Sequence, residues 1–306
     1  MKKALFILSF LLFAATISAQ INPADSTVQV VTYWDKKEAH TYNMTYEKIK
    51  VKGTDSIVNQ KVSYTVDIKV VDSTAKSYTI EWKYRDYVLN GADQKRLEET
   101  GASKILGLFQ GQEVRFKTDE NGSFTELLNW REIKKRQEES IKLLVKGAKL
   151  PKEIKNVLDK LNSKETIQNY VLKDVMQFHN FYGIALSLGK PVEQQLDAGT
   201  ALTGPLKSET SLFLEEIDFE NREYIVKFLQ SFEGEDLNKV LGTVLGELFP
   251  DLASKADMSK IKLDSMDDYY GALMHDTGWP VSSYYERVIR IGENQSVERR
   301  TIEFVE

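Results

Sequence analysis

Two segments of the chain alternate strictly between apolar and polar residues. Every second residue is apolar from Val62 to Val70, and again from Tyr78 to Tyr84. Such alternation is typical of antiparallel strands with one buried face and one wet face. The turn-forming residues Asp72-Ser73-Thr74-Ala75 lie between the two segments, so the sequence predicts a hairpin here.

Further strands are predicted towards both ends of the chain. They run from Val28 to Trp34, Tyr42 to Val51, Ser211 to Phe219, Arg222 to Phe232, Ser283 to Ile291 and Val297 to Val305. The third and fourth of these carry apolar residues on both faces, which indicates that this part of the sheet is covered on both sides. The last two flank the predicted turn Gly292-Glu293-Asn294-Gln295.

The stretch KTDENGSFTELLNW has two competing interpretations. Oxygen-bearing side chains occur two residues apart, at Asp119, Asn121 and Ser123, as they do where a calcium loop begins. A calcium loop counted from Asp119 needs glycine at its sixth position and glutamate at its twelfth, where this chain has Phe124 and Trp130. Asn121-Gly122 lies between two apolar runs and is a strong hairpin signal. We therefore predict a turn rather than a metal site.

A helical period begins at Asn129. Asn129 is a candidate N-cap with Glu132 three residues later, a second helix is predicted after Pro151, and a third is predicted after Asn162. These helices form a predicted insertion, from about residue 129 to residue 181. A further helix is predicted from Glu235 to Phe249, with Leu237, Val240, Leu241, Val244, Leu245 and Leu248 in its apolar stripe. Packing on the sheet is the favoured interpretation of this helix, and docking to a partner or a membrane is the alternative.

The first residues read MKKALFILSFLLFAATISAQ, with a positive start, a short apolar run and small residues before Gln20. This pattern indicates a signal peptide, residues 1–19, that is cleaved after Ala19. No other apolar run approaches the length of a membrane helix, so we expect an exported chain without a transmembrane segment, in the periplasm or outside the cell. Residues 20–306 are predicted to form one domain.

The amino-acid composition argues against several classes of function. The chain has no cysteine, which excludes disulfides and thiolate chemistry, and its length is sufficient for a core that needs no such links. The formal net charge is −5, and loss of Lys2 and Lys3 with the signal peptide makes it −7. An acidic balance argues against nucleic-acid binding, which depends on clustered Lys and Arg.

Catalytic motifs are weak in this sequence. The three histidines His40, His179 and His275 are far apart, and no nucleotide-binding loop or nucleophile elbow occurs. Asp276-Thr277-Gly278 matches the aspartic-protease triplet, but the mechanism needs two copies, so a turn is favoured. Asp264, Asp267 and Asp268 are interpreted as a solvated loop in preference to a cation site. We expect no cofactor, no metal and no catalytic residues.

Aromatic residues concentrate in the first and last predicted strands. If those strands are neighbours in a curved sheet, their rings either fill the core or line a concave face for an apolar or sugar-like ligand. The candidate ligand-binding residues are Tyr64, Tyr78, Trp82, Leu241 and Leu245.

The order of these features resembles an uncharacterised family of exported Bacteroidota proteins of similar length. The resemblance rests on the ending SAQ of the signal peptide, on FKTDENGSFTELLN before the helical insertion, on LGKPVEQQLDAGTAL and on HDTGWPVSSYYERVIRIG. These motifs are turns and strand ends, and the resemblance implies no catalytic residue. The expected architecture is also similar, more loosely, to periplasmic lipoprotein-carrier and lipid-binding half-barrels.

The sequence therefore predicts an α+β fold, with a large curved antiparallel sheet built from both ends of the chain and helices packed on its concave face. The leading hypothesis for function is a non-enzymatic envelope protein that binds a lipid or acyl chain between sheet and helices. A structural component that binds an envelope protein partner is the second hypothesis. A hydrolase that uses Asp267, Asp268 or Asp276 is the third and least favoured.

Overall fold

The computed structural model describes residues 20–92, 94–95, 110–144, 164, 167, 172–198, 206–248 and 263–305, apart from the side chains of 141, 143, 144 and 243–248. Most of the described chain forms one antiparallel sheet of eleven strands, in the order β7-β6-β5-β4-β3-β14-β13-β12-β11-β10-β9. The bounds of its strands are β3 Ala39–Lys52, β4 Asp55–Thr74, β5 Ser77–Asn90, β6 Glu113–Asp119, β7 Phe124–Leu127, β9 Val192–Asp197, β10 Lys207–Asp218, β11 Glu223–Glu233, β12 Ser265–His275, β13 Pro280–Ile291 and β14 Asn294–Val305.

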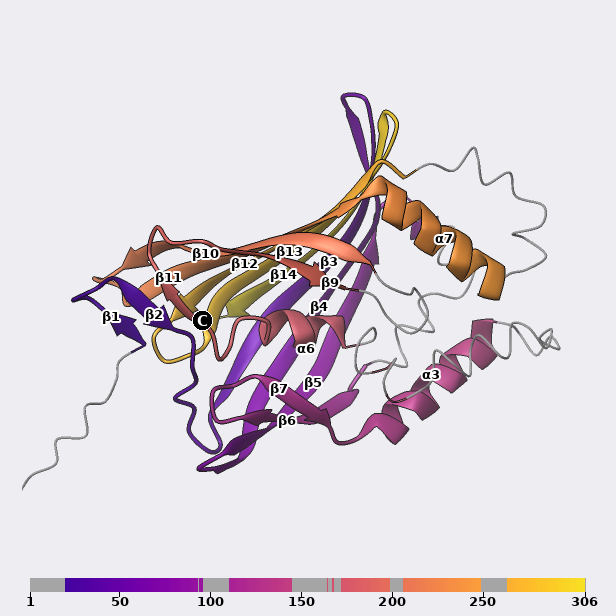
Figure 1. The fold of residues 1–306 in the computed structure, drawn as a ribbon. Coiled ribbons are helices and arrows are strands. Elements are labelled where there is room, and N and C mark those ends of the chain that lie inside the picture. Colours follow the sequence, from indigo (N-terminus) through magenta and orange to yellow (C-terminus); the bar gives the residue numbers. More distant parts are fainter. Residues whose placement is uncertain are drawn as a thin grey trace, which may run out of the picture.

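The sheet unites the two ends of the chain, as the sequence predicts. Strand β3 pairs with β14 over twelve residue pairs, from Asn294↔Lys52 to Val305↔Thr41. The predicted hairpin is confirmed as β4 and β5, although its turn is Ala75-Lys76, later than expected. The sheet is open, and Figure 1 shows it curled around a short helix, α6 (Lys173–Phe178).

The predicted α+β class is corrected to a mostly β fold. Strands β3, β4 and β5 contain 14, 20 and 14 residues, far more than their alternating segments indicate. Register shifts near Ile49, Tyr64 and Val71 explain the difference, since a bulge lets a strand continue where the apolar alternation breaks. Strand content is therefore higher than the sequence pattern predicts.

The described helices lie on the concave side of the sheet in Figure 1. They are α3 (Trp130–Leu144) and α6 within the predicted insertion, and α7 (Gly234–Leu248) where a helix from Glu235 is expected. The helix predicted after Pro151 lies outside the described residues, and so does most of the helix predicted after Asn162. Asn129 does not cap α3 through its side chain: its carboxamide bonds the backbone of Arg115 and Glu113 on β6 instead.

A small second sheet lies beside the end of the large one. It contains β1 (Ile21–Asn22), β2 (Thr27–Gln29) and β8 (Ala185–Ser187) in the order β1-β2-β8. Only the first two residues of the strand predicted from Val28 to Trp34 are therefore in a strand. Thr32 and Trp34 are nevertheless buried, because this segment crosses the turn between β12 and β13.

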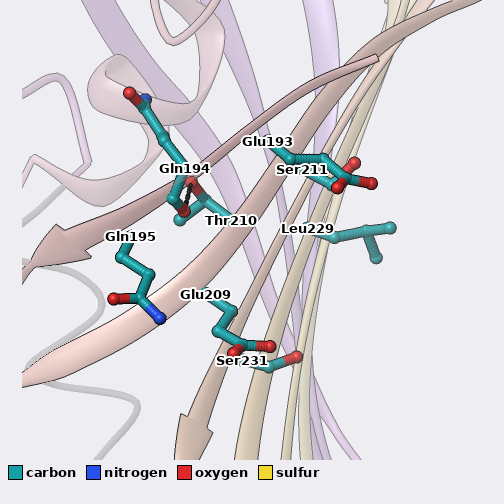
Figure 2. A pocket seen from close by; sticks show the side chains of 8 residues that line it. All are labelled: Glu193, Gln194, Gln195, Glu209, Thr210, Ser211, Leu229 and Ser231. Carbon is teal, nitrogen blue, oxygen red and sulfur yellow. Dashed lines mark hydrogen bonds between the residues drawn. The ribbon is translucent and has the colours of Figure 1, made fainter.

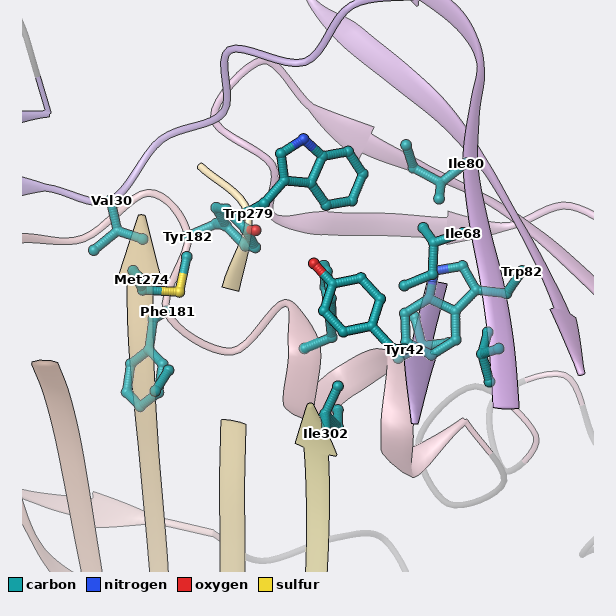
Figure 3. Close-up of a cluster of buried hydrophobic side chains, with 14 of the residues drawn as sticks. Val30, Tyr42, Ile68, Ile80, Trp82, Phe181, Tyr182, Met274, Trp279 and Ile302 are labelled. Atoms are coloured by element: carbon teal, nitrogen blue, oxygen red, sulfur yellow. The ribbon is translucent and has the colours of Figure 1, made fainter. Parts of the chain in front are cut away.

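The main core fills the concave side around α6 (Figure 3). Tyr42 and Trp82 are fully buried there against Phe178, and Trp279 stacks on Trp34 with ring centroids 4.6 Å apart. A second, smaller cluster forms under α7, from Leu206, Phe232 and Leu237. The concave face thus carries two separate apolar clusters.

Two turn predictions are confirmed. Asn121-Gly122 joins β6 to β7, and the Asp119 carboxylate accepts the backbone N–H groups of Asn121 and Ser123, at 3.0 and 2.9 Å. Asp276-Thr277-Gly278 is the turn between β12 and β13. The Asp119 carboxylate holds its own turn, and the Asp276 carboxylate accepts from Arg222, just before β11.

The segment around Asp264, Asp267 and Asp268 is not the solvated loop that the sequence indicates. It leads into β12, which pairs with β11 and β13 along its whole length. Asp268 is buried and bonds Arg287, and Asp267 bonds Arg290, both on β13. The acids are tolerated in a central strand because arginines from the neighbouring strand neutralise them.

Candidate ligand site on the concave face

The registers of the large sheet align the concave side chains into rows that cross the strands. Directly paired residues share one face, so the pairings define each row. The tyrosine row, as we name it, contains Phe228, Tyr270, Tyr285, Arg300, Tyr46 and Val62. The polar row lies two residues further along each strand and contains Thr210, Gln230, Asp268, Arg287, Glu298, Lys48 and Gln60.

The polar row separates the two apolar clusters. Phe228 and Tyr270 on one side of it pack against the main core, and Phe232 and Met266 on the other side belong to the cluster under α7. Seven consecutive strands contribute a polar or charged residue to this row. A stripe of this kind on the inner face of a sheet offers polar groups to whatever lies in the concavity.

The buried centre of the polar row is an ion pair. Asp268 is 3% exposed, and both of its carboxylate oxygens accept hydrogen bonds of 2.6 Å from Arg287. Tyr285 donates a further bond of 3.3 Å to the same carboxylate. Burial, with the nearby Asp268 charge, raises the pKa of Tyr270 to about 12, so this tyrosine stays protonated at neutral pH. Arg287 thus neutralises the buried Asp268 carboxylate within the row.

Helix α6 brings polar side chains to the same face. Gln177 donates to Ser283 Oγ at 3.2 Å and to the Arg300 carbonyl at 3.4 Å. Lys173 pairs with Glu298 of the polar row, and Asp174 accepts a 2.8 Å hydrogen bond from the Tyr64 hydroxyl. The helix is therefore docked through polar contacts on this side and through Val175 and Phe178 on its apolar side.

Arg300 is a buried charge with two unpartnered nitrogen atoms among the described residues. Its side chain is 9% exposed, and its guanidinium lies over the Tyr285 ring, 4.2 Å from the centroid. Glu298 is 3.9 Å from Nη2, which is longer than a hydrogen bond. Among the described residues, Nε and Nη1 have no hydrogen-bond partner, and the same holds for the buried Oε1 of Gln177. A buried guanidinium with unpaired N–H groups is costly unless something accepts from it.

A cavity of about 260 Å³ adjoins Arg300. It is lined by Tyr46, Val62, Tyr64, Lys173, Asp174, Glu298 and Arg300. Two cations, two carboxylates, two phenols and one aliphatic side chain thus meet where the tyrosine row, the polar row and α6 adjoin. We call it the Arg300 cavity.

Tyr64 of the cavity lining belongs to a group of three packed tyrosines. The rings of Tyr64 and Tyr87 are stacked with centroids 4.9 Å apart, and those of Tyr84 and Tyr87 are stacked at 6.5 Å. Burial, followed by the negative charge of Asp174, raises the pKa of all three phenols. They remain neutral donors with apolar ring faces throughout the physiological pH range.

The residues expected to bind ligand do not form a single site. Tyr64 lines the Arg300 cavity, whereas Trp82 is fully buried in the main core and Tyr78 packs edge-on against Trp34, with ring centroids 5.4 Å apart. Leu241 lies on α7, in neither apolar cluster among the described residues, and the side chain of Leu245 lies outside the described residues. Tyr64 and Tyr78 both pack against the main core that contains Trp82, and Leu241 is not part of that core.

Sequence reasoning missed the charged residues of the cavity, Lys173, Asp174, Glu298 and Arg300. One signal was present: Arg300 and Glu298 are in phase with Ile302 and Phe304, so alternation places all four on one face. A charged pair in phase with apolar residues indicates a buried polar site on a strand.

The other chemical candidates are dispersed. His40, His179 and His275 lie with Glu38, with the Gly122 carbonyl and with Thr277, respectively. Asp267 and Asp268 are successive strand residues and point to opposite faces, so they cannot share a proton. Asp276 pairs with Arg222. Among the described residues, no three His, Cys, Asp or Glu are placed to hold one metal ion.

A larger hollow of about 520 Å³ lies at the other end of the sheet, around the edge strand β9. Figure 2 shows its polar lining, which comes from Glu193, Gln194, Gln195, Glu209, Thr210, Ser211, Leu229 and Ser231. All six residues of β9 are exposed. This hollow has no buried unpaired charge among its described lining residues, and its main feature is the free edge of a strand.

None of the described helices is both long enough and apolar enough to cross a membrane. No protein-family model matches the sequence, and no curated protein matches it. Solved structures show weak likenesses, and lipovitellin, described for its lipid–protein interactions, aligns with 89% of this chain at 13% identity and a TM-score of 0.43. The aligned part is 25% of the lipovitellin chain, so this chain spans about a quarter of that protein.

Two Bacteroides proteins show weaker likenesses. A protein from Bacteroides fragilis with a YmcC-like fold aligns with 91% of this chain and 100% of its own, at 8% identity and a TM-score of 0.25. A porin-like protein from Bacteroides uniformis aligns with 90% of this chain and 98% of its own, at 6% identity and a TM-score of 0.20. At these TM-scores the likenesses establish neither a shared fold nor a shared function.

Proposed function

We propose that the protein is an exported, non-enzymatic carrier that binds a lipid or another acyl chain on the concave face of its half-barrel sheet. One observation carries the proposal: on that face a row of aromatic residues runs beside a row of polar residues, and the two rows meet at the Arg300 cavity. An amphiphile has an apolar and a polar part, and each part finds matching side chains there.

The apolar part of such a ligand has suitable neighbours. Val62 and the ring faces of Tyr46 and Tyr64 line the cavity, and Tyr64 stacks with Tyr87. Aromatic rings present large apolar surfaces with little loss of side-chain entropy on binding. The concave face therefore supplies contact area without a large rearrangement of the sheet.

Export is a further part of the proposal. Gln20 follows the predicted cleavage site, and its side chain is buried, donates to the Val31 carbonyl and accepts from Tyr224 Oη at 2.5 Å. The packed part of the fold thus includes the residue that would begin the mature chain. Intact-mass measurement of protein from its own cells tests this, and a mass that includes residues 1–19 would contradict it.

The main experiment is native mass spectrometry of protein purified from its own envelope, followed by organic extraction and lipid analysis. We expect a stoichiometric amphiphile that is released by extraction. A bare polypeptide mass, together with no binding of added acyl chains by the purified protein, would refute the carrier.

A pair of neighbouring substitutions locates the binding site. Val62→Trp fills part of the Arg300 cavity, whereas Ser63→Trp places the same side chain on the opposite face of β4. We expect Val62→Trp alone to reduce the bound amphiphile, with both variants showing cooperative unfolding. Equal occupancy in the two variants would place the ligand elsewhere.

A second candidate function is favoured by the edge strand. Strand β9 is fully exposed and ends the sheet, with Val192 and Leu196 47% and 38% exposed. An exposed edge pairs readily with an extended segment of another protein. Under this alternative, crosslinking in the native envelope recovers a partner through β9. The Gln194 carbonyl faces β10, where it accepts from Thr210 Oγ1, so the next residue, Gln195, presents its backbone N–H to the free edge. Replacing Gln195 by proline removes this edge donor, and loss of the crosslink would support the alternative.

A further inference from the structure

We infer that the Arg300 cavity binds a zwitterionic headgroup, in which a phosphate and an ammonium group are carried by the same amphiphile. This inference rests on the proposed function, because it names the class of ligand that the concave face takes. It goes beyond that function because an acyl chain alone requires no charged group.

The phosphate part follows from Arg300. Its side chain is nine-tenths buried and lines the cavity, and its buried Nε and Nη1 have no partner among the described residues. A guanidinium is always charged and presents N–H groups in a fork that matches phosphate oxygens. Lys173 adds a second cation to the same lining. A group rich in acceptor oxygens, such as phosphate, complements these donors.

The ammonium part follows from the balance of charge. Glu298 and Asp174 line the same cavity as Arg300 and Lys173, so two negative charges offset two positive ones. Glu298 lies 3.3 Å from Lys173 and 3.9 Å from Arg300, and Asp174 accepts from Tyr64. A purely anionic group would be attracted by the two cations and repelled by the two carboxylates. A headgroup with no net charge places opposite charges beside both pairs.

The size of the cavity agrees with a headgroup rather than a whole lipid. Its volume is about 260 Å³. Pockets for complete drug-sized ligands usually occupy about 300 to 1,000 Å³, so this cavity accommodates the polar part alone. The apolar chain would then lie along the tyrosine row, where Tyr46 and Val62 adjoin Arg300 on the same face.

The experiment compares four lauroyl amphiphiles with the same chain and different headgroups. They are lauroyl lysophosphatidylethanolamine (zwitterionic), lauroyl lysophosphatidylglycerol (anionic), laurate (a carboxylate) and monolaurin (uncharged). Binding of each to delipidated full-length mature protein is measured by titration calorimetry below the critical micelle concentration. We expect the zwitterionic compound to bind most tightly, and free phosphoethanolamine without a chain to bind weakly.

Three variants assign the effect to Arg300. Arg300→Gln removes the charge, Arg300→Lys keeps the charge and loses the fork, and Arg299→Gln removes the neighbouring arginine on the opposite face, which pairs with Glu286. We expect Arg300→Gln to weaken binding of the zwitterionic compound by about 10- to 100-fold, which is the range for loss of a hydrogen bond to a charged group. Arg300→Lys should show a smaller loss and Arg299→Gln no loss.

The outcomes separate this inference from the proposed function. Monolaurin and laurate could bind wild-type protein as tightly as the zwitterionic compound does, with none of the three affinities changed by Arg300→Gln. This result would refute the headgroup site and leave the carrier proposal standing. Preference for the anionic compound also refutes the zwitterionic assignment. If no lauroyl compound binds, both proposals fail. Should Arg300→Gln unfold, Arg300→Lys provides the same comparison in a folded chain.

Discussion

Tyr64 on β4 donates a hydrogen bond of 2.8 Å to the carboxylate of Asp174 on α6, across 110 positions of sequence. The bond helps to hold α6, which Figure 1 shows within the curl of the sheet. Because both residues also line the Arg300 cavity, the contact that docks the helix also shapes the candidate site.

Replacing Tyr64 by phenylalanine should therefore destabilise the fold and alter the cavity together. A hydrogen bond to a charged group contributes about 2 kcal/mol, and we expect the free energy of unfolding to fall by about that amount. Urea denaturation measures the change. Tyr78→Phe is the control, because Tyr78 packs through its ring against Trp34. The free energy of unfolding should fall much less in this variant. Equal losses would show that the bond to Asp174 does not dock α6.

The buried pair Asp268 and Arg287 should be the most sensitive ion pair of the sheet. The Asp268 side chain is 4% exposed and that of Arg287 is 34% exposed, so Asp268→Asn removes the buried partner of the pair. Breaking a buried pair costs about 3–5 kcal/mol, and we expect a loss near the lower end. Asp267→Asn is a matched control one residue away, because its pair with Arg290 is 36% and 42% exposed. An exposed pair contributes about 1 kcal/mol or less. The prediction is wrong if chemical denaturation gives similar losses for the two variants.

Alternation in the sequence was sufficient to predict the strands that have one wet face. Val62 to Val70 and Tyr78 to Tyr84 became parts of β4 and β5, and strands from the two ends of the chain became neighbours as β3 and β14. These predictions succeeded because the period of two is a local property of each strand. The lengths of the strands were missed because bulges depend on the partner strand.

Strand β12 could not be recognised in the same way. Its sequence Asp267-Asp268-Tyr269-Tyr270 places two acids and then two aromatics in succession, which breaks every apolar alternation. Acids are stable there because Arg287 and Arg290 lie on the adjacent strand, and this pairing becomes visible only when the register of β12 and β13 is known. The candidate site was missed for the same reason, since its charges come from β14 and α6.

Strands β10 and β11 show where pattern and packing diverge. Apolar residues on both of their faces indicated cover on both sides, but Leu229, on the outer face of β11, is 39% exposed. Among the described elements, α6 and α7 lie on the concave side. An apolar pattern on both faces therefore does not establish that both faces are covered.

Gly278 should tolerate substitution much less than Gly292, although both have positive φ. An added Cβ at Gly278, where φ is +86°, would lie 2.5 Å from the Val31 carbonyl oxygen and 2.9 Å from Thr32 Cα. At Gly292, where φ is +55°, it would meet nothing within 4 Å among the described residues. We expect Gly292→Ala to lower the free energy of unfolding by about 1 kcal/mol and Gly278→Ala to lower it by about 3 kcal/mol or more. Thermal and urea denaturation measure both, and comparable losses would contradict the steric explanation.

His179 should make the fold sensitive to acid. The ring is fully enclosed by Trp34, Phe116, Phe178 and Tyr182, and one ring nitrogen is 2.7 Å from the Gly122 carbonyl. Burial lowers the pKa of His179 to about 4, because the charged form loses its hydration. The unfolded chain, with a histidine pKa near 6.5, therefore binds the proton first.

The free energy of unfolding should accordingly be highest above about pH 6.5. It should decline as the pH falls from there to about 4, because protons then bind preferentially to the unfolded chain. The loss over this interval is about 3 kcal/mol if His179 alone is responsible. His179→Asn keeps a donor for the Gly122 carbonyl but does not titrate, so its unfolding free energy should vary less over this range. His275→Asn, at the turn between β12 and β13, is the control and should keep the wild-type slope. A wild-type slope in His179→Asn would assign the acid sensitivity to other groups.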